Sequence, residues 1–261
     1  MAEKLVRLEQ RGPIATVLLD NPPVNAASVA LIEELHAVLD EIEGNRGIRC
    51  VILSGAGSKA FCAGADLRQE KDFLDPEASR QFRELGRRTL ERIETFSRPI
   101  IAAIHGYCIG GGTALAWACD IRIAADNAVF RAGDAYLGVI PSWGMGLLRL
   151  PRLLGRARVL DILLLGENFG ASRACDLGLV SEVVARAELE TRSGQVAARI
   201  ASASPTAILA IRKAVNFNLR HQWDAMAEYE EELAAQVFAD PDSEEGMAAF
   251  LEKRQPQFHD L

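Results

Sequence analysis

The chain has 261 residues and a mass of 28.4 kDa, with 49% hydrophobic and 25% charged residues, which is typical of a globular protein with a substantial core. A formal net charge of -7 and a pI near 5.3 oppose nonspecific attraction to nucleic acid or to an anionic membrane surface. The sequence contains neither a signal-peptide core nor a long uncharged apolar run. We therefore expect a cytoplasmic protein without a membrane segment.

In chain order, apolar runs bounded by turn residues predict strands at residues 5–8, 14–19, 50–53, 100–104, 121–124 and 128–130. Capping residues and helical periodicity predict helices after Ser28, over 76–96 and 113–119, and after Ser204 and Asp240. Strand, glycine-rich loop and helix follow one another twice. The pattern predicts an α/β core followed by a helical C-terminal region, in one domain with a helical extension.

Cysteines and histidines show no spacing that suits a metal site or a redox pair, because the five cysteines and four histidines are scattered along the chain. Reduced cysteines that pack in the core are expected. A dinucleotide fingerprint is excluded because Gly55-Ala56-Gly57 lacks the third glycine, and no GxxxxGK[ST] run occurs. We expect no metal and no separate cofactor.

Two glycine-rich loops, 61–67 and 105–112, each follow a predicted strand. Small residues in these loops let a ligand approach the backbone, and the second loop opens a helix whose first N–H groups have no intrahelical acceptor. One N–H donor from each loop is the construction that holds a thioester oxyanion. The alternative is that the glycines serve only tight turns and close helix packing.

Six segments together resemble the crotonase superfamily, the enoyl-CoA hydratase/isomerase family. They are residues 61–67 (FCAGADL), 99–112 with 119–120, 137–141, 150–155, 170–180 and 246–254. Their order and separation match as well, so the resemblance covers nearly the whole chain. It implies a crotonase-like spiral of ββα units over residues 1–200 and a helical region over 201–261 that forms homotrimers or dimers of trimers.

The same resemblance implies an acyl-CoA thioester as substrate, with coenzyme A as part of that substrate, and a role in lipid or fatty acid metabolism. It assigns the oxyanion-hole amides to Ala65 and Gly111. It assigns substrate binding to Ala63, Gly64, Ala65, Asp66, Leu67 and Gly110, and an approach to a CoA phosphate to Lys253. For Lys253, the alternative is a solvated helix face.

Hydratases of this superfamily use two glutamates, and the first of these positions is Ala114 here. The second is Asp134, which keeps a carboxylate. A methyl group cannot activate water, whereas one carboxylate beside an oxyanion hole can move a proton between two carbons. We therefore expect enoyl-CoA double-bond isomerisation with Asp134 as the acid/base. The alternatives are an enoyl-CoA hydratase, another acyl-CoA lyase, hydrolase or decarboxylase, or a non-catalytic acyl-CoA-binding protein.

Two side chains near the expected site have competing interpretations. Asp134 follows Gly133 and is a favoured residue type for capping a helix instead of catalysing a reaction. Trp143 stands where related sequences have small residues, so we expect it to narrow the acyl pocket, with plain core packing as the alternative.

Overall fold

The computed structural model of the chain describes residues 4–67, 75–143, 145–220, 228, 231–232, 234–235, 237–239 and 241–257. In this part of the chain the helices are α1 (Val29–Gly44), α3 (Pro76–Thr95), α4 (Gly111–Ala118), η2 (Asp134–Leu137), η3 (Met145–Arg149), α5 (Leu150–Leu154), α6 (Arg156–Leu165), α7 (Ala171–Asp176), η4 (Arg186–Glu188), α8 (Leu189–Ala201), α9 (Pro205–Arg220) and α11 (Pro241–Glu252). Here η2 and η4 are 3-10 helices and η3 is a π-helical turn.

The described strands form two sheets. The larger sheet has the order β1 (Val6–Arg11), β2 (Ile14–Leu19), β3 (Cys50–Gly55), β5 (Ile100–Ile104), β7 (Ile121–Ala125) and β10 (Glu182–Val184). The smaller sheet has the order β4 (Ala60–Cys62), β6 (Tyr107–Ile109), β8 (Val129–Arg131) and β9 (Phe169–Gly170). Only the β1–β2 and β8–β9 pairs are antiparallel; the other pairs are parallel.

Repeated units of two strands and a helix connect the two sheets. In β3–β4–α3, β5–β6–α4 and β7–β8–η2, the first strand joins the larger sheet and the second joins the smaller one. Because β4, β6 and β8 pair in parallel, their ends meet at one edge of the smaller sheet. This arrangement confirms the predicted ββα spiral and gathers the loops that follow these strands.

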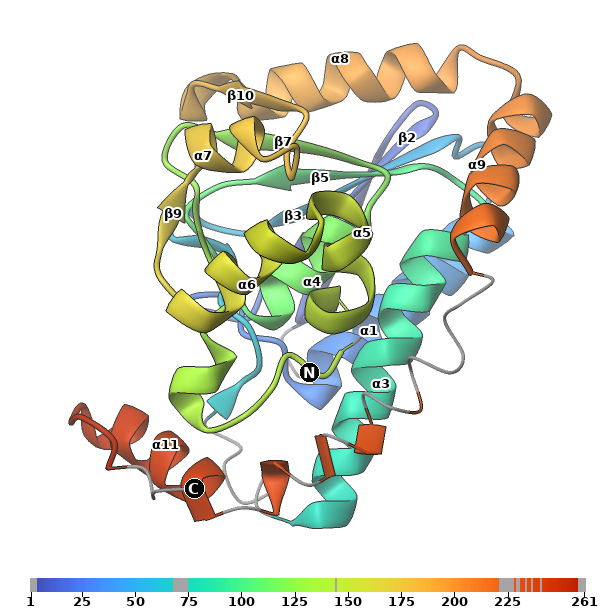
Figure 1. Cartoon of the computed structure of the whole chain (residues 1–261). Coiled ribbons are helices and arrows are strands. Elements are labelled where there is room, and N and C mark those ends of the chain that lie inside the picture. The colour runs from blue at the N-terminus through green and yellow to red at the C-terminus, as the bar shows by residue number, and fades with distance from the viewer. Residues whose placement is uncertain are drawn as a thin grey trace.

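The larger sheet is buried on both faces because its side chains alternate between two apolar clusters. On one face, Cys50, Ile52 and Ile101 pack with Leu189 and Ala197 of α8. On the other face, the alternate residues of the same strands pack with α1, α3 and α4. Figure 1 shows α8 along one side of the strands, with α3 and α4 on the other.

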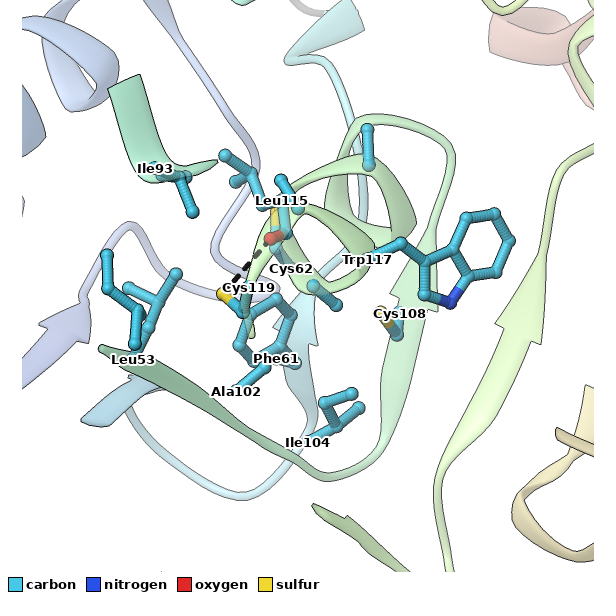
Figure 2. Packing of buried hydrophobic residues seen from close by; sticks show 14 of the residues in the cluster. Leu53, Phe61, Cys62, Ile93, Ala102, Ile104, Cys108, Leu115, Trp117 and Cys119 are labelled. Carbon is cyan, nitrogen blue, oxygen red and sulfur yellow. Dashed lines mark hydrogen bonds between the residues drawn. The ribbon is translucent and has the colours of Figure 1, made fainter. Parts of the chain in front are cut away.

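Helix α4 lies at the centre of the second cluster. Figure 2 shows Leu115 and Cys119 directed among Phe61 and other core side chains, where the Cys119 thiol donates to the Leu115 carbonyl at 3.3 Å. The five cysteines are free, and four of them are buried. Burial raises the pKa of Cys62 to about 12, so this thiol stays protonated at neutral pH. The prediction of reduced, packing cysteines is confirmed.

The C-terminal helices extend from this core as predicted. Ser204 caps α9, since its hydroxyl accepts from Ala207 N at 3.3 Å. Asp120 ties α9 to the core because one carboxylate oxygen accepts from Ile100 N at 2.7 Å and the other from Arg212 at 2.7 Å. Asp240 and residues 68–74 lie outside the described residues. The boundary at residue 200 stays a prediction, as does the role of 201–261 in trimerisation.

Across the described residues, no helix is both long and apolar enough to cross a membrane.

Candidate active site

A cavity of about 290 Å³ opens where the smaller sheet meets α3, α4, η2 and α11. Its wall includes the loop after β4, the start of α4, the chain after β8, and the C-terminal segment around α11. Most of the lining is apolar, and a few polar side chains point to it. A mostly apolar cavity with few polar groups is the common form of a small-molecule site.

The loop after β4 brings Ala65 to the wall of the cavity. Ala27 fixes this loop on both sides of Ala65, because Ala27 N donates to the Gly64 carbonyl at 2.7 Å and Asp66 N donates to the Ala27 carbonyl at 3.2 Å. Gly64 has φ +94°, and a Cβ there would lie 3.0 Å from the Ile109 carbonyl oxygen. Glycine is therefore required for the close approach. No hydrogen bond of the Ala65 N–H occurs within the described part of the chain.

The second amide belongs to Gly111, the first residue of α4. Gly110 N donates to the Arg131 carbonyl at 2.9 Å and so fixes the start of this helix on β8. A Cβ on Gly112 would lie only 2.0 Å from the Cys62 carbonyl oxygen, and one on Gly64 would lie 3.5 Å from Gly111 N. The two glycine loops are thus packed backbone to backbone. The Gly111 N–H has no acceptor among the described residues, as expected for the first turn of a helix.

Asp134, the first residue of η2, presents a carboxylate to the same cavity. The residue is half-buried, but its Oδ2 is fully enclosed and has no hydrogen-bond partner among the described residues. Burial raises the pKa of Asp134 to about 6, against a weaker opposing effect of the nearby Arg131 guanidinium. Gly133, not Asp134, occupies the N-cap position of η2, and no side chain caps this helix. The capping alternative is therefore wrong.

Trp143 belongs to both the core and the cavity wall. It is 8% exposed, packs edge-on against Phe82 with ring centroids 5.3 Å apart, and lines the cavity. A Cβ on Gly111 would lie 2.9 Å from the Trp143 ring, so the indole packs against Gly111. Core packing of Trp143 is confirmed, and its narrowing of an acyl pocket stays a prediction.

The remaining predicted residues divide into two groups. Ala63, Gly64, Leu67 and Gly110 line the cavity together with Ala65, Gly111, Asp134 and Trp143. Asp66 and Lys253 are described residues that do not line it. Asp66 is buried behind the loop, whereas Lys253 is exposed just after α11 with φ 57°. The roles proposed for all these residues stay predictions.

Sequence reasoning missed several polar side chains of the cavity, among them Arg83, Trp117, Arg131 and Arg254. Trp117 had a readable signal, because Gly111, Ala114 and Trp117 are spaced three residues apart and share one face of α4. The three arginines had no readable signal in the sequence. Arg83 pairs with Glu231 at 2.8 Å and Arg254 with Glu245 at 2.6 Å, both in contacts that only the folded chain creates.

Among the described residues, no group of three or more His, Cys, Asp or Glu side chains is arranged to hold a metal ion.

The sequence model of the family described as enoyl-CoA hydratase/isomerase matches residues 9–261. The chain belongs to the enoyl-CoA hydratase/isomerase family. Membership spans the ββα units and the C-terminal helices alike. The predicted resemblance to the crotonase superfamily is therefore confirmed.

Relatives and solved structures agree with this assignment over the full chain. A probable enoyl-CoA hydratase of Bacillus subtilis is 39% identical over 247 residues, which are 94% of this chain and 95% of that protein. The crystal structure of an enoyl-CoA hydratase from Bacillus anthracis is 35% identical with a TM-score of 0.80 and covers 98% and 99% of the two chains. That of a methylmalonyl CoA decarboxylase is 29% identical with a TM-score of 0.87 and covers both chains completely. Hydratases and a decarboxylase thus share this fold.

Proposed function

We propose that this enzyme binds an unsaturated acyl-CoA, stabilises the enolate of its thioester, and moves the double bond of an enoyl-CoA. The amides of Ala65 and Gly111 hold the thioester oxygen in this proposal, and Asp134 is the acid/base. The observation that carries it is the Asp134 Oδ2, a buried and unpaired carboxylate oxygen in a cavity that both amides adjoin.

The proton transfer follows from these groups. Ionised Asp134 removes a proton from C2 of a 3-enoyl thioester, and the electron pair moves onto the thioester oxygen, where two N–H donors stabilise the charge. Protonated Asp134 then delivers the proton to C4 as the enolate collapses. The double bond moves from C3–C4 to C2–C3, and atoms and charge balance without a water nucleophile.

Ala114 supports isomerisation over hydration. Its methyl group lines the cavity one turn along α4 from Gly111, where the superfamily's hydratases have a glutamate. Asp134 is the one carboxylate in the described lining of the cavity. A single carboxylate suffices to carry one proton between two carbons, whereas water addition also requires a group that orients the water.

Hydration is the second candidate, because the Bacillus subtilis relative is named a probable enoyl-CoA hydratase. In that reaction Asp134 activates water for attack on C3 of a 2-enoyl thioester. The two candidates differ in their product, an isomeric enoyl-CoA or a 3-hydroxyacyl-CoA.

The experiment follows a 3-enoyl-CoA and a 2-enoyl-CoA by NMR in deuterated water with wild type, Asp134→Asn and Asp161→Asn. Asp161 is exposed on α6 and serves as the matched control. We expect deuterium at C2 and C4 and migration of the double bond in wild type and in Asp161→Asn. Asp134→Asn should lower the exchange rate by at least about 100-fold while acyl-CoA binding survives.

A 3-hydroxyacyl-CoA as the main product would mean that the enzyme hydrates enoyl-CoA instead of isomerising it. Tight binding without exchange or conversion of either thioester would reduce the protein to a non-catalytic acyl-CoA-binding protein. Equal rates in wild type and Asp134→Asn would reject Asp134 as the acid/base.

Assembly through residues 201–261 belongs to the same proposal. Ile211 and Val215 of α9 are 60% and 55% exposed and lie one turn apart. Exposed apolar side chains on one helix face mark an association surface. We assign this face to the contacts of a homotrimer or a dimer of trimers.

A further inference from the structure

The indole N–H of Trp117 is a buried hydrogen-bond donor without an acceptor. Trp117 is 4% exposed, lines the cavity, and its Nε1 has no partner among the described residues. Figure 2 shows the indole projecting from α4 away from Leu115 and Cys119, which point into the core. Buried donors are normally paired, so an unpaired one in a ligand cavity indicates an acceptor supplied by the ligand.

Several other polar side chains of the cavity already have partners. Arg83 donates to Ser79 at 2.8 Å and pairs with Glu231, and Arg131 donates to the Gly166 carbonyl at 2.7 Å. The Thr113 hydroxyl donates to the Gly110 carbonyl at 2.6 Å, and the Tyr136 hydroxyl donates to the Leu164 carbonyl at 3.0 Å. Trp117 Nε1 and Asp134 Oδ2 are the buried lining atoms that remain unpaired in the described chain.

The position of Trp117 along α4 tells which part of the ligand it faces. Gly111, Ala114 and Trp117 follow one another along a single helix face, and all three line the cavity. With a rise of about 1.5 Å per residue, Trp117 lies about 9 Å further along the helix axis than the Gly111 amide. A thioester carbonyl held at Gly111 places the carbons next to it level with the first turn of α4. The indole is then further along the acyl group than the carbons that exchange protons with Asp134.

An indole N–H only donates, so its partner must be an acceptor atom, and an acyl chain supplies one as a hydroxyl or carbonyl oxygen. We propose that Trp117 is a specificity-determining residue that binds an oxygen substituent of the acyl group, distal to the reacting carbons. The substrate class is then an oxygen-bearing acyl-CoA, with a hydroxyl or keto group along its chain, in preference to a plain hydrocarbon acyl-CoA. This inference rests on the proposed binding of acyl-CoA with its carbonyl at Ala65 and Gly111.

Calorimetric titration of the full-length protein tests the inference without requiring turnover. The ligands are hexanoyl-CoA, 5-oxohexanoyl-CoA and 6-hydroxyhexanoyl-CoA, and the proteins are wild type, Trp117→Phe and Trp143→Phe. Phenylalanine keeps an aromatic ring but removes the donor. We expect at least one oxygen-bearing ligand to bind wild type about tenfold more tightly than hexanoyl-CoA, and Trp117→Phe to lose this preference while keeping its affinity for hexanoyl-CoA.

Trp143→Phe is the matched control because Trp143 lines the same cavity beside Gly111. It should change the affinities of all three ligands alike and leave their ratio intact. Thermal unfolding of the unliganded proteins provides a second readout, which checks that Trp117→Phe stays folded with a smaller ring in the core cluster.

Equal affinity of wild type for all three ligands would overturn the inference, because the ligand oxygen would then gain nothing from the indole N–H. So would an equal loss of affinity for all three in Trp117→Phe. The proton-exchange experiment on Asp134 is independent of this result. If the protein prefers oxygen-bearing ligands but exchanges no proton, the proposed isomerase activity is rejected and the inference about Trp117 stands.

Discussion

At the scale of single residues, the site depends on one carboxylate whose surroundings oppose its charge. Asp134 Oδ2 is enclosed and unpaired, and burial raises the pKa of this carboxyl to about 6 from an ordinary value of 3.8. A base is more effective when its pKa lies near the working pH. Burial thus suits Asp134 to the proposed proton transfer. Burying the charged carboxylate lowers the stability of the folded protein.

The pH dependence of proton exchange follows from this pKa. Ionised Asp134 is the form that removes a proton, so the exchange rate under kcat/KM conditions should rise with pH and level off above about 6. NMR exchange measurements across this range check the profile. A rate that is flat between pH 5 and pH 7, or one that falls as pH rises, would contradict Asp134 as the base.

Stability should change in the opposite direction, and the sign follows from linkage. The pKa of Asp134 is higher in the folded than in the unfolded state, so its protonated form favours folding. This contribution is complete below about pH 4 and is lost as pH rises through about 6. Asp134→Asn should therefore unfold at a higher temperature than wild type at neutral pH and at a similar temperature below about pH 4.

At the scale of elements, the contact between the loop after β4 and the start of α4 sets the separation of the two amides. Gly64 lies against the Ile109 carbonyl, and Gly112 lies against the Cys62 carbonyl. Both contacts are backbone to backbone, so neither partner can rotate away from an added side chain. We therefore expect the proposed oxyanion hole to be disrupted by a single methyl group at either glycine.

Gly112→Ala tests this contact. A Cβ at 2.0 Å from the Cys62 carbonyl oxygen forces the two loops apart. We expect a loss of about 3 kcal/mol in the free energy of unfolding and a large loss of proton exchange. Chemical denaturation and the NMR exchange measurement check the two effects.

Gly170→Ala is the matched control because a Cβ at Gly170 meets nothing within 4 Å and its φ is -86°. This variant should keep the stability and the exchange rate of wild type. If Gly112→Ala behaved like Gly170→Ala, close packing of the loops would not define the oxyanion hole.

At the scale of the whole molecule, the C-terminal segment contributes to two places: α11 forms part of the cavity wall, and α9 carries the proposed assembly surface. Helix α11 packs on η2, where a Cβ on Gly138 would lie 2.1 Å from the Asp242 carbonyl oxygen and one on Gly246 would lie 2.4 Å from the Leu137 carbonyl carbon. It thereby supports the helix that begins with Asp134 and adds Met247 and Phe250 to the cavity wall. Figure 1 shows α9 well away from α11.

The proposed assembly surface on α9 leads to a prediction about mass in solution. We expect wild type to elute as a trimer or a dimer of trimers in size-exclusion chromatography with light scattering. The double variant Ile211→Asp/Val215→Asp should release the 28.4 kDa monomer, because it places charges on the apolar face. Lys213→Ala, on an exposed residue of the same helix, should keep the wild-type mass. A monomeric wild type would reject the assembly.

The sequence by itself determined most strands of the larger sheet, several helix starts and the positions of the two glycine-rich segments, because alternation, capping and glycine placement are local properties. It missed the short strands β4, β6, β9 and β10, and β4 and β6 overlap the segments predicted as glycine-rich loops, because two or three residues carry too little pattern to mark a strand. Ser28, for example, caps α1 as its residue type predicts. The motifs also pointed to Ala65, Gly111 and Asp134 together, since their order along the chain matches a known family. The Trp117 spacing was equally present in the sequence, but its meaning depended on which face of α4 lines a cavity.

Tertiary structure alone decided what surrounds each of these groups. From the sequence, Asp134 could equally be a helix cap. The structure places Gly133 at the cap and encloses Asp134 Oδ2 without a partner among the described residues. From the sequence, Trp143 could lie either in the pocket wall or in the core. In the structure it packs against both Gly111 and Phe82. Arg83 and Glu231, far apart in sequence, pair only when α3 meets the C-terminal segment. Burial and pairing arise from contacts between distant parts of the chain, so local sequence patterns do not encode them.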